Sequence, residues 1–197
     1  MKLWDWRASA YDWFRKLPPF KALVGGEMAN AADLLSDIAL KQEALLDVGT
    51  GTGQALQLFP PDVRVAAADR SWAMLQKARG RHAQSRFFLA DATALPFKSR
   101  TFFLVTAIGV FEYQRDAQQL LRELKRVTMP DGFVLLTYSP LNIFNFLRFI
   151  WGLPVYLVSA RKFDELVDRA GLICQTKKSS LIQKQVLLTQ KEGHAQV

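Results

Sequence analysis

The chain has 197 residues, half of them hydrophobic and 22% charged, which is enough for one apolar core and excludes the intrinsically disordered class. The single cysteine, Cys174, excludes an internal disulfide, and the first residues lack the apolar core of a secretory signal, so we expect a cytoplasmic protein. A formal net charge of +8 indicates attraction to something anionic, either nucleic acid or a lipid surface, without distinguishing between them.

Short apolar runs then alternate along the chain with longer segments of helical periodicity. Strands are expected at 43–48, 63–68, 86–90, 102–108, 132–138, 172–178 and 184–190, and helices at 27–40, 52–59, 71–83, 113–127 and 161–170. This alternation predicts an α/β fold with right-handed crossovers and a doubly wound, mostly parallel sheet. Only a few residues separate the last two strands, which predicts a hairpin that makes one edge strand antiparallel. We expect a single domain over 1–197, with an N-terminal helical cap in 1–40.

The densest motif is LLDVGTGTGQ at residues 45–54, where Gly49, Gly51 and Gly53 follow an apolar strand. Ligands of doubly wound sheets bind at the carboxyl ends of the strands, and glycine lets the backbone turn tightly and approach a ligand closely. The glycine spacing does not match the dinucleotide-binding fingerprint, whether counted from Gly49 or from Gly51. A P-loop requires a Gly-Lys-Ser/Thr ending, and none follows these glycines. The loop therefore predicts a ligand site without naming the ligand.

Acidic residues stand at the ends of the first three predicted strands. Asp47 ends the first, and Asp69 ends the second at the spacing where an acid reaches ribose hydroxyls in doubly wound folds. Asp91 ends the third, beside an apolar loop where its carboxylate could accept from an adenine amino group. For each acid alone a strand-end or N-cap role is the more common explanation, but together the three should converge on one side of the sheet.

Taken in order, these motifs resemble the class I S-adenosylmethionine-dependent methyltransferases, especially the branch that methylates small molecules and quinones. The resemblance covers roughly residues 9–190 and rests on LLDVGTGTGQ, AAADRSWAMLQKAR, LADATALPF, TFFLVTAIGVFEY, RELKRVTMPDGFVLLT and FDELVDRAGL. It implies a Rossmann-like seven-stranded sheet, S-adenosylmethionine as the cofactor and no metal.

The resemblance also implies roles for individual residues. The glycine loop would hold the amino acid part of the cofactor, with Asp47 orienting its ammonium group and Asp69 accepting from the ribose hydroxyls. Trp72 and Ala92 would contact adenine, although Trp72 could equally pack its helix onto the sheet. The implied cofactor-binding residues are Asp47, Gly49, Thr50, Gly51, Gly53, Asp69, Arg70, Trp72, Asp91 (on the adenine amine), Ala92 and Ile108 (beneath the sulfonium).

A general base is needed only where the acceptor atom must lose a proton. The candidate catalytic residues are Tyr11, Glu112 and Tyr113, with Tyr138 after the fifth strand as a further candidate. Many relatives carry His where Tyr113 stands. We expect His82 to be solvated.

The most distinctive stretch outside the core motifs is SPLNIFNFLRFIWGLPVYLVSA, an apolar insertion at residues 139–160 that in this family lies over the acceptor pocket. We interpret it either as a lid that lines a lipophilic pocket or as a segment that contacts a membrane surface, helped by the basic charge. GVFEY lacks the prolines of enzymes that methylate exocyclic base amines, which disfavours nucleic acid as a partner.

The sequence thus predicts a methyltransferase for a small, lipophilic or aromatic acceptor, either quinone-like or a lipid. Two alternatives remain open: a non-catalytic, cofactor-binding regulatory protein, and an RNA or protein methyltransferase.

Overall fold

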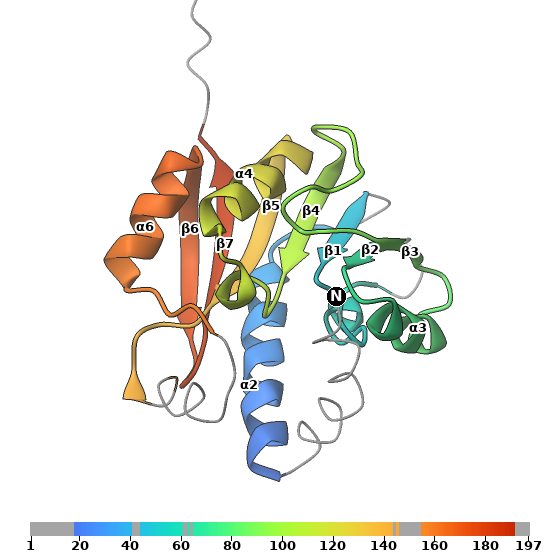
Figure 1. Cartoon of the computed structure of the whole chain (residues 1–197), viewed down its shortest axis with the longest axis horizontal. Coiled ribbons are helices and arrows are strands. Elements are labelled where there is room, and N and C mark those ends of the chain that lie inside the picture. Colours follow the sequence, from blue (N-terminus) through green and yellow to red (C-terminus); the bar gives the residue numbers. More distant parts are fainter. Residues whose placement is uncertain are drawn as a thin grey trace, which may run out of the picture.

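The computed structural model describes residues 18–40, 44–60, 63, 65–143, 145 and 155–191, which form a seven-stranded sheet flanked by helices (Figure 1). The strands are β1 (Leu45–Val48), β2 (Val65–Asp69), β3 (Arg86–Leu89), β4 (Phe102–Ala107), β5 (Thr128–Tyr138), β6 (Leu172–Ser179) and β7 (Lys184–Gln190). The helices are α2 (Pro18–Leu35), α3 (Trp72–Arg81), α4 (Ala117–Val127) and α6 (Ala160–Arg169), with 3-10 helices η1 (Ala55–Leu58) and η2 (Phe111–Tyr113).

The strand order is β3-β2-β1-β4-β5-β7-β6, and every neighbouring pair from β3 to β5 is parallel. β7 runs antiparallel to both β5 and β6, which confirms the mostly parallel, doubly wound sheet and its C-terminal hairpin. The prediction that the antiparallel strand lies at an edge is wrong, because β7 is interior and β6 forms the edge. Burial explains this order: residues 185–188 of β7 are all buried, whereas the lysine-bearing β6 is mostly exposed or half-buried.

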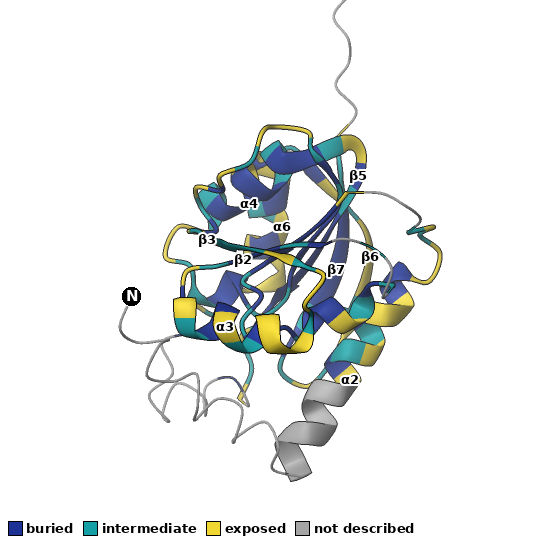
Figure 2. Cartoon of the chain, turned by 90° about the vertical axis from the view of Figure 1, so that its right-hand side faces the viewer, coloured by how far each residue is buried: buried dark blue, intermediate teal, exposed yellow. Residues whose placement is uncertain are grey.

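Alternate side chains of the strands build two cores, one on each face of the sheet. Leu46, Val105 and Leu136 belong to the core that includes residues of α4 and α6. Leu45 and Leu104 belong to the core that includes residues of α2 and η1. Figure 2 shows the buried strands between these helix layers, with α3 on the same side as α2. Since helices cover both faces, polar side chains gather at the strand ends.

Two predicted helices are shorter in the structure than the sequence indicated. The helix expected at 52–59 is only the 3-10 helix η1, because Gly53 adopts φ +85° two residues before it and Pro60 follows. The helix expected at 113–127 divides into η2 and α4, since Asp116 caps α4 by accepting from the Gln119 N–H at 2.9 Å.

Part of the N-terminal cap, with Tyr11, and most of the stretch 144–154 of the apolar insertion lie outside the described residues. Among the residues that are described, no helix combines the length and the apolar character needed to span a bilayer.

Candidate functional site

The glycine loop after β1 adopts left-handed φ values of +67°, +55° and +85° at Gly49, Gly51 and Gly53. A Cβ added at Gly49 would overlap Val110 Cγ2, and one added at Gly53 would lie 3.2 Å from Ala78 Cβ. At Gly51 the nearest atom to an added Cβ would be a backbone oxygen 3.9 Å away. Gly49 and Gly53 are therefore packed against the protein, while Gly51 leaves the space into which a ligand can approach the backbone.

β2 anchors this loop by backbone and side-chain acceptors. The N–H groups of Gly49 and Thr50 donate to the Ala68 carbonyl at 2.7 and 3.1 Å. The Gly51 N–H donates to Asp69 Oδ2, and the Ser71 N–H donates to Asp69 Oδ1, both at 2.8 Å. Each carboxylate oxygen retains further acceptor capacity, so Asp69 can hold the loop and still accept from a ligand hydroxyl.

Burial raises the pKa of Asp69, opposed by the backbone hydrogen bonds from Ser71 and Gly51. The carboxylate is thus partly desolvated before any ligand arrives, which strengthens a hydrogen bond from a hydroxyl group.

Asp47 is almost fully buried at the end of β1, directly before the loop. Its Oδ1 accepts from the Thr106 hydroxyl at 2.6 Å, whereas its Oδ2 is buried without a hydrogen-bond partner among the described residues. Burial raises the pKa of Asp47 to about 7, with the Asp69 carboxylate adding to the shift and the Thr106 and Thr50 hydroxyls opposing it. A cationic ligand group at Oδ2 would restore the charged form, so the chemistry of this acid fits an ammonium group.

Trp72 is the first residue of α3, whose N-cap Ser71 accepts from the Met74 N–H at 3.3 Å. Its side chain is 49% exposed, with the Arg79 guanidinium 6.0 Å from the ring centroid. This exposure does not fit the alternative in which Trp72 packs its helix onto the sheet. The ring remains available to a flat apolar ligand next to the loop.

Asp91 and Ala92 follow β3. Asp91 Oδ1 accepts from the Thr93 N–H at 2.8 Å and from the Thr93 hydroxyl at 2.6 Å, and these bonds lower the pKa of Asp91. Asp91 is exposed and Ala92 is buried, and Arg70, after β2, is exposed. The structure thus places the predicted adenine-side residues in the turns that follow β2 and β3, with Asp91 ionised and its turn already formed.

The segment after β4 carries the predicted catalytic residues. Ile108 is half-buried, and the Gly109 N–H donates to the Thr137 hydroxyl at 2.7 Å. Glu112 is fully buried in η2, where its Oε1 accepts from Gln183 Nε2 at 2.8 Å and more weakly from the Ser139 hydroxyl at 3.3 Å. The next residue, Tyr113, is half-buried.

Sequence reasoning did not identify Thr106, Gln183 or Ser139 as site residues. Thr106 hydrogen bonds to Asp47 across neighbouring strands, and Gln183 reaches Glu112 from the turn before β7. Each is a common polar residue without a local motif, and only the strand order brings it to the site. The buried Gln185 belongs to the same region, because it lies opposite Thr137 and accepts from Asn30 Nδ2 at 3.3 Å.

Two other expectations need correction. Tyr138 is fully buried and stacks on Phe163 with ring centroids 3.9 Å apart, and burial raises the pKa of its phenol to about 12, so it is not a general base. His82 is not a freely solvated residue, because it is half-buried and its Cδ2 would lie 3.4 Å from a Cβ at Gly53.

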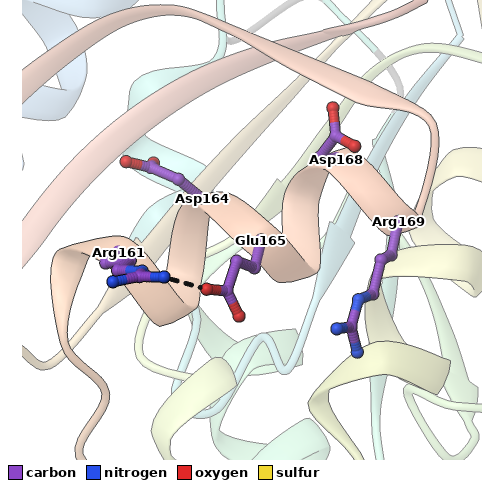
Figure 3. A pocket seen from close by; sticks show the side chains of 5 residues that line it. All are labelled: Arg161, Asp164, Glu165, Asp168 and Arg169. Carbon is purple, nitrogen blue, oxygen red and sulfur yellow. Dashed lines mark hydrogen bonds and ion pairs between the residues drawn. The ribbon is translucent and has the colours of Figure 1, made fainter.

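A hollow on the surface of α6 is lined by Arg161, Asp164, Glu165, Asp168 and Arg169 (Figure 3). All five side chains come from one helix, and Arg161 pairs with Glu165 at 3.3 Å. None of the glycine-loop or strand-end residues lines it. We interpret it as a solvated, charged helix face rather than as part of the site.

Comparison with known proteins relates this chain to methyltransferases. The family model for the methyltransferase domain matches residues 46–136, from β1 through most of β5. The demethylmenaquinone methyltransferase of Thermotoga maritima is 30% identical over 150 residues, which cover 74% of this chain and 64% of that protein. The enzyme of the same name from Thermus thermophilus is 38% identical over 141 residues, or 68% of this chain and 63% of that protein. The chain thus matches somewhat less than two thirds of the length of either relative.

Residues 46–136 thus match the methyltransferase-domain family, and the chain is similar to methyltransferases of known activity. The solved magnesium protoporphyrin IX methyltransferase from Synechocystis PCC 6803 with bound SAH superimposes with a TM-score of 0.76. That match covers 93% of this chain and 95% of that one at 16% identity, a likeness that shows the fold alone. The cofactor of the family is S-adenosylmethionine.

The residues of this methyltransferase-family site fit that cofactor on structural grounds. Open space at Gly51 leaves the backbone accessible, and the unpartnered Asp47 Oδ2 suits an ammonium group. Asp69 retains acceptor capacity for a diol, and the exposed Trp72 offers an apolar wall. Asp47 lies in β1 and Asp69 in the neighbouring parallel strand β2, so the pairing of these two strands fixes the relative positions of the two acids.

Proposed function

We propose that this chain transfers a methyl group from S-adenosylmethionine to a small, lipophilic acceptor. The observation that carries the proposal is the glycine loop, in which a Cβ at Gly51 would meet only a backbone oxygen at 3.9 Å, with the buried Asp47 before the loop and the half-buried Asp69 bonded to the Gly51 N–H. When bound, S-adenosylmethionine supplies a methyl group already activated by its sulfonium, so the protein has mainly to align the acceptor and exclude water.

Cofactor binding would involve the turns after the first three strands. Asp47 would orient the ammonium group, Asp69 would accept from the ribose hydroxyls, and Trp72 would cover the adenine. The predicted positions Thr50, Arg70, Asp91, Ala92 and Ile108 would complete the cofactor site, with Ile108 nearest the end of β4.

Glu112 is our candidate for the group that accepts a proton from the acceptor. Its Oε1 is held by donors from two other segments, Gln183 and Ser139, which fixes the carboxylate beside the end of β4. Such fixed geometry is the first requirement of a general base. Tyr113 and Tyr11 remain candidates for the general base, ranked below Glu112. Tyr11 lies outside the described residues.

The acceptor is proposed to be quinone-like. Both relatives described above are demethylmenaquinone methyltransferases, and another, from Halorhodospira halophila, is a malonyl-[acyl-carrier protein] O-methyltransferase at 35% identity over 42% of its length. The amides of Gln183 and Gln185, both largely buried at the start of β7, suit an uncharged ring with carbonyl or hydroxyl groups. A lipid headgroup is the second acceptor class that we propose, in view of the apolar composition of residues 139–160.

Calorimetric titration of the full chain with S-adenosylmethionine, S-adenosylhomocysteine and NAD tests the cofactor assignment. We expect micromolar binding of the first two and none of NAD. Asp69→Ala should weaken that binding about tenfold or more, because a charged acceptor is lost, while the exposed Asp131→Ala serves as the matched control. Unchanged affinity in Asp69→Ala would remove Asp69 from the cofactor site.

Transfer of a labelled methyl group into lipid extracts then tests the activity. Incorporation into a quinone fraction that is lost in Glu112→Gln supports the proposal. Tight cofactor binding without incorporation into any extract would favour a non-catalytic regulatory protein, and incorporation into RNA would favour the nucleic-acid alternative.

A further inference from the structure

We propose that an exposed apolar tip formed by Leu141, Ile143 and Leu181 docks this protein onto an anionic lipid surface. The three side chains are 63%, 65% and 62% exposed, the highest values among the large hydrophobic residues that the structure describes. Two of them follow β5, and the third lies in the turn between β6 and β7. Single exposed apolar residues are common on protein surfaces, whereas a group of them held together in one place is not.

Two asparagines join these segments. Asn142, which stands between Leu141 and Ile143, donates from Nδ2 to the Leu181 carbonyl at 2.9 Å. Asn145 is fully buried and donates from Nδ2 to the carbonyls of Pro140 and Ile182, both at 2.9 Å. The apolar tip is therefore a fixed surface built from residues about 40 positions apart, not a chance group of mobile side chains.

Positive charge predominates in the chain, whose formal net charge is +8. Beside the apolar tip, Lys178 pairs with Asp33, whereas Lys184, the first residue of β7, makes no ion pair among the described residues. An anionic membrane attracts a basic protein and accepts apolar side chains between its headgroups. The net charge together with the exposed aliphatic side chains therefore favours lipid as the occupant.

The apolar tip also lies at the functional edge of the sheet. β5 ends at Tyr138 and β7 begins at Lys184, so the tip follows the same carboxyl edge from which the glycine loop and Glu112 project. Figure 1 shows the segment after β5 and the β6–β7 turn at the same end of the sheet. Docking there would bring a membrane-dissolved acceptor to the site, and only this consequence rests on the proposed function.

Sedimentation with phosphatidylcholine vesicles, with and without phosphatidylglycerol, tests the docking without cofactor or acceptor. We expect the full chain to bind the anionic vesicles more tightly than the neutral ones. Ile143→Ser and Leu181→Ser should each weaken that binding about tenfold, because each removes one large apolar side chain from the contact. Leu89→Ser is the matched control, since Leu89 is 55% exposed on the edge strand β3, away from the tip.

Equal losses in all three variants, or no loss in the tip variants, would overturn the proposal. The proposal would also be overturned if the wild-type chain self-associates without vesicles and Ile143→Ser abolishes this self-association, since the tip would then bind a second copy. Cofactor titration is independent of this measurement, so a failure of lipid docking and a failure of the methyltransferase proposal give different results.

Discussion

The buried Asp47 should destabilise the protein at alkaline pH, and Asp47→Asn should relieve this effect. Its pKa lies at about 7 in the folded protein, mainly because of burial, compared with about 4 in an unfolded chain. At a pH between these two pKa values, Asp47 carries a proton in the folded state that it has released in the unfolded state. The free energy of unfolding therefore falls as pH rises through this window, and the loss is complete above the folded pKa.

The size of the effect follows from the two pKa values. A difference of about three pKa units corresponds to roughly 4 kcal/mol at pH 8, of which roughly 1.5 kcal/mol is already lost at pH 5. Asn has the same shape, keeps an acceptor for the Thr106 hydroxyl and carries no charge. Other effects of the substitution are the same at both pH values, so the stability of Asp47→Asn relative to wild type should rise by about 2 to 3 kcal/mol from pH 5 to pH 8.

Urea unfolding of both proteins at pH 5 and pH 8 measures this difference directly. Asp91→Asn is the control, because the pKa of Asp91 is lowered by Thr93 and its charge is therefore fully present at both pH values. A relative stability of Asp47→Asn that does not change with pH would refute the reasoning, since the carboxylate would then be solvated. The same variant should bind S-adenosylmethionine more weakly despite its greater stability, because the ammonium group loses its counter-charge.

Four further predictions separate packing from function. Gly49→Ala should lower the free energy of unfolding by about 2 to 4 kcal/mol through overlap with Val110 and left-handed strain, as measured in urea. Gly51→Ala should cost only about 1 kcal/mol in the same assay but should weaken cofactor binding in calorimetry, because its Cβ enters open space. Glu112→Gln should lower the turnover number by about a hundredfold with unchanged cofactor affinity; equal affinity and equal turnover would exclude it as the base. Tyr138→Phe should leave methyl transfer intact and change stability by less than about 1 kcal/mol in urea, since its buried hydroxyl has no partner among the described residues.

The cofactor half of the site was predictable because its determinants are local in sequence. Gly49, Gly51 and Gly53 and the acid before them lie within one strand–loop unit, and left-handed φ values at all three glycines confirm the expected tight turning. Strand alternation likewise predicted the parallel sheet. What could not be predicted was the reason for each glycine, because Val110 and Ala78 approach from other segments.

The acceptor half depends on contacts between distant segments. Gln183 lies 71 residues from Glu112, and they meet because β7 enters the sheet beside β5. Sequence reasoning placed the antiparallel strand at the edge, where Gln183 could not have reached the middle of the sheet. The same misplacement explains why Gln185 was not anticipated as a buried residue. Hairpins can be inferred from short connections, but the strand beside which a hairpin inserts depends on tertiary packing.

The two buried carboxylates of the site, Asp47 and Glu112, differ in the donors that hold one oxygen of each. Asp47 receives one side-chain hydroxyl on Oδ1, and its Oδ2 has no hydrogen-bond partner among the described residues, so its charged form is disfavoured until a cation arrives. Glu112 receives two side-chain donors on one oxygen, from segments that converge only in the folded sheet. The first arrangement suits recognition of a charged ligand, because binding provides the missing partner. The second suits proton transfer, because the carboxylate is positioned before an acceptor enters.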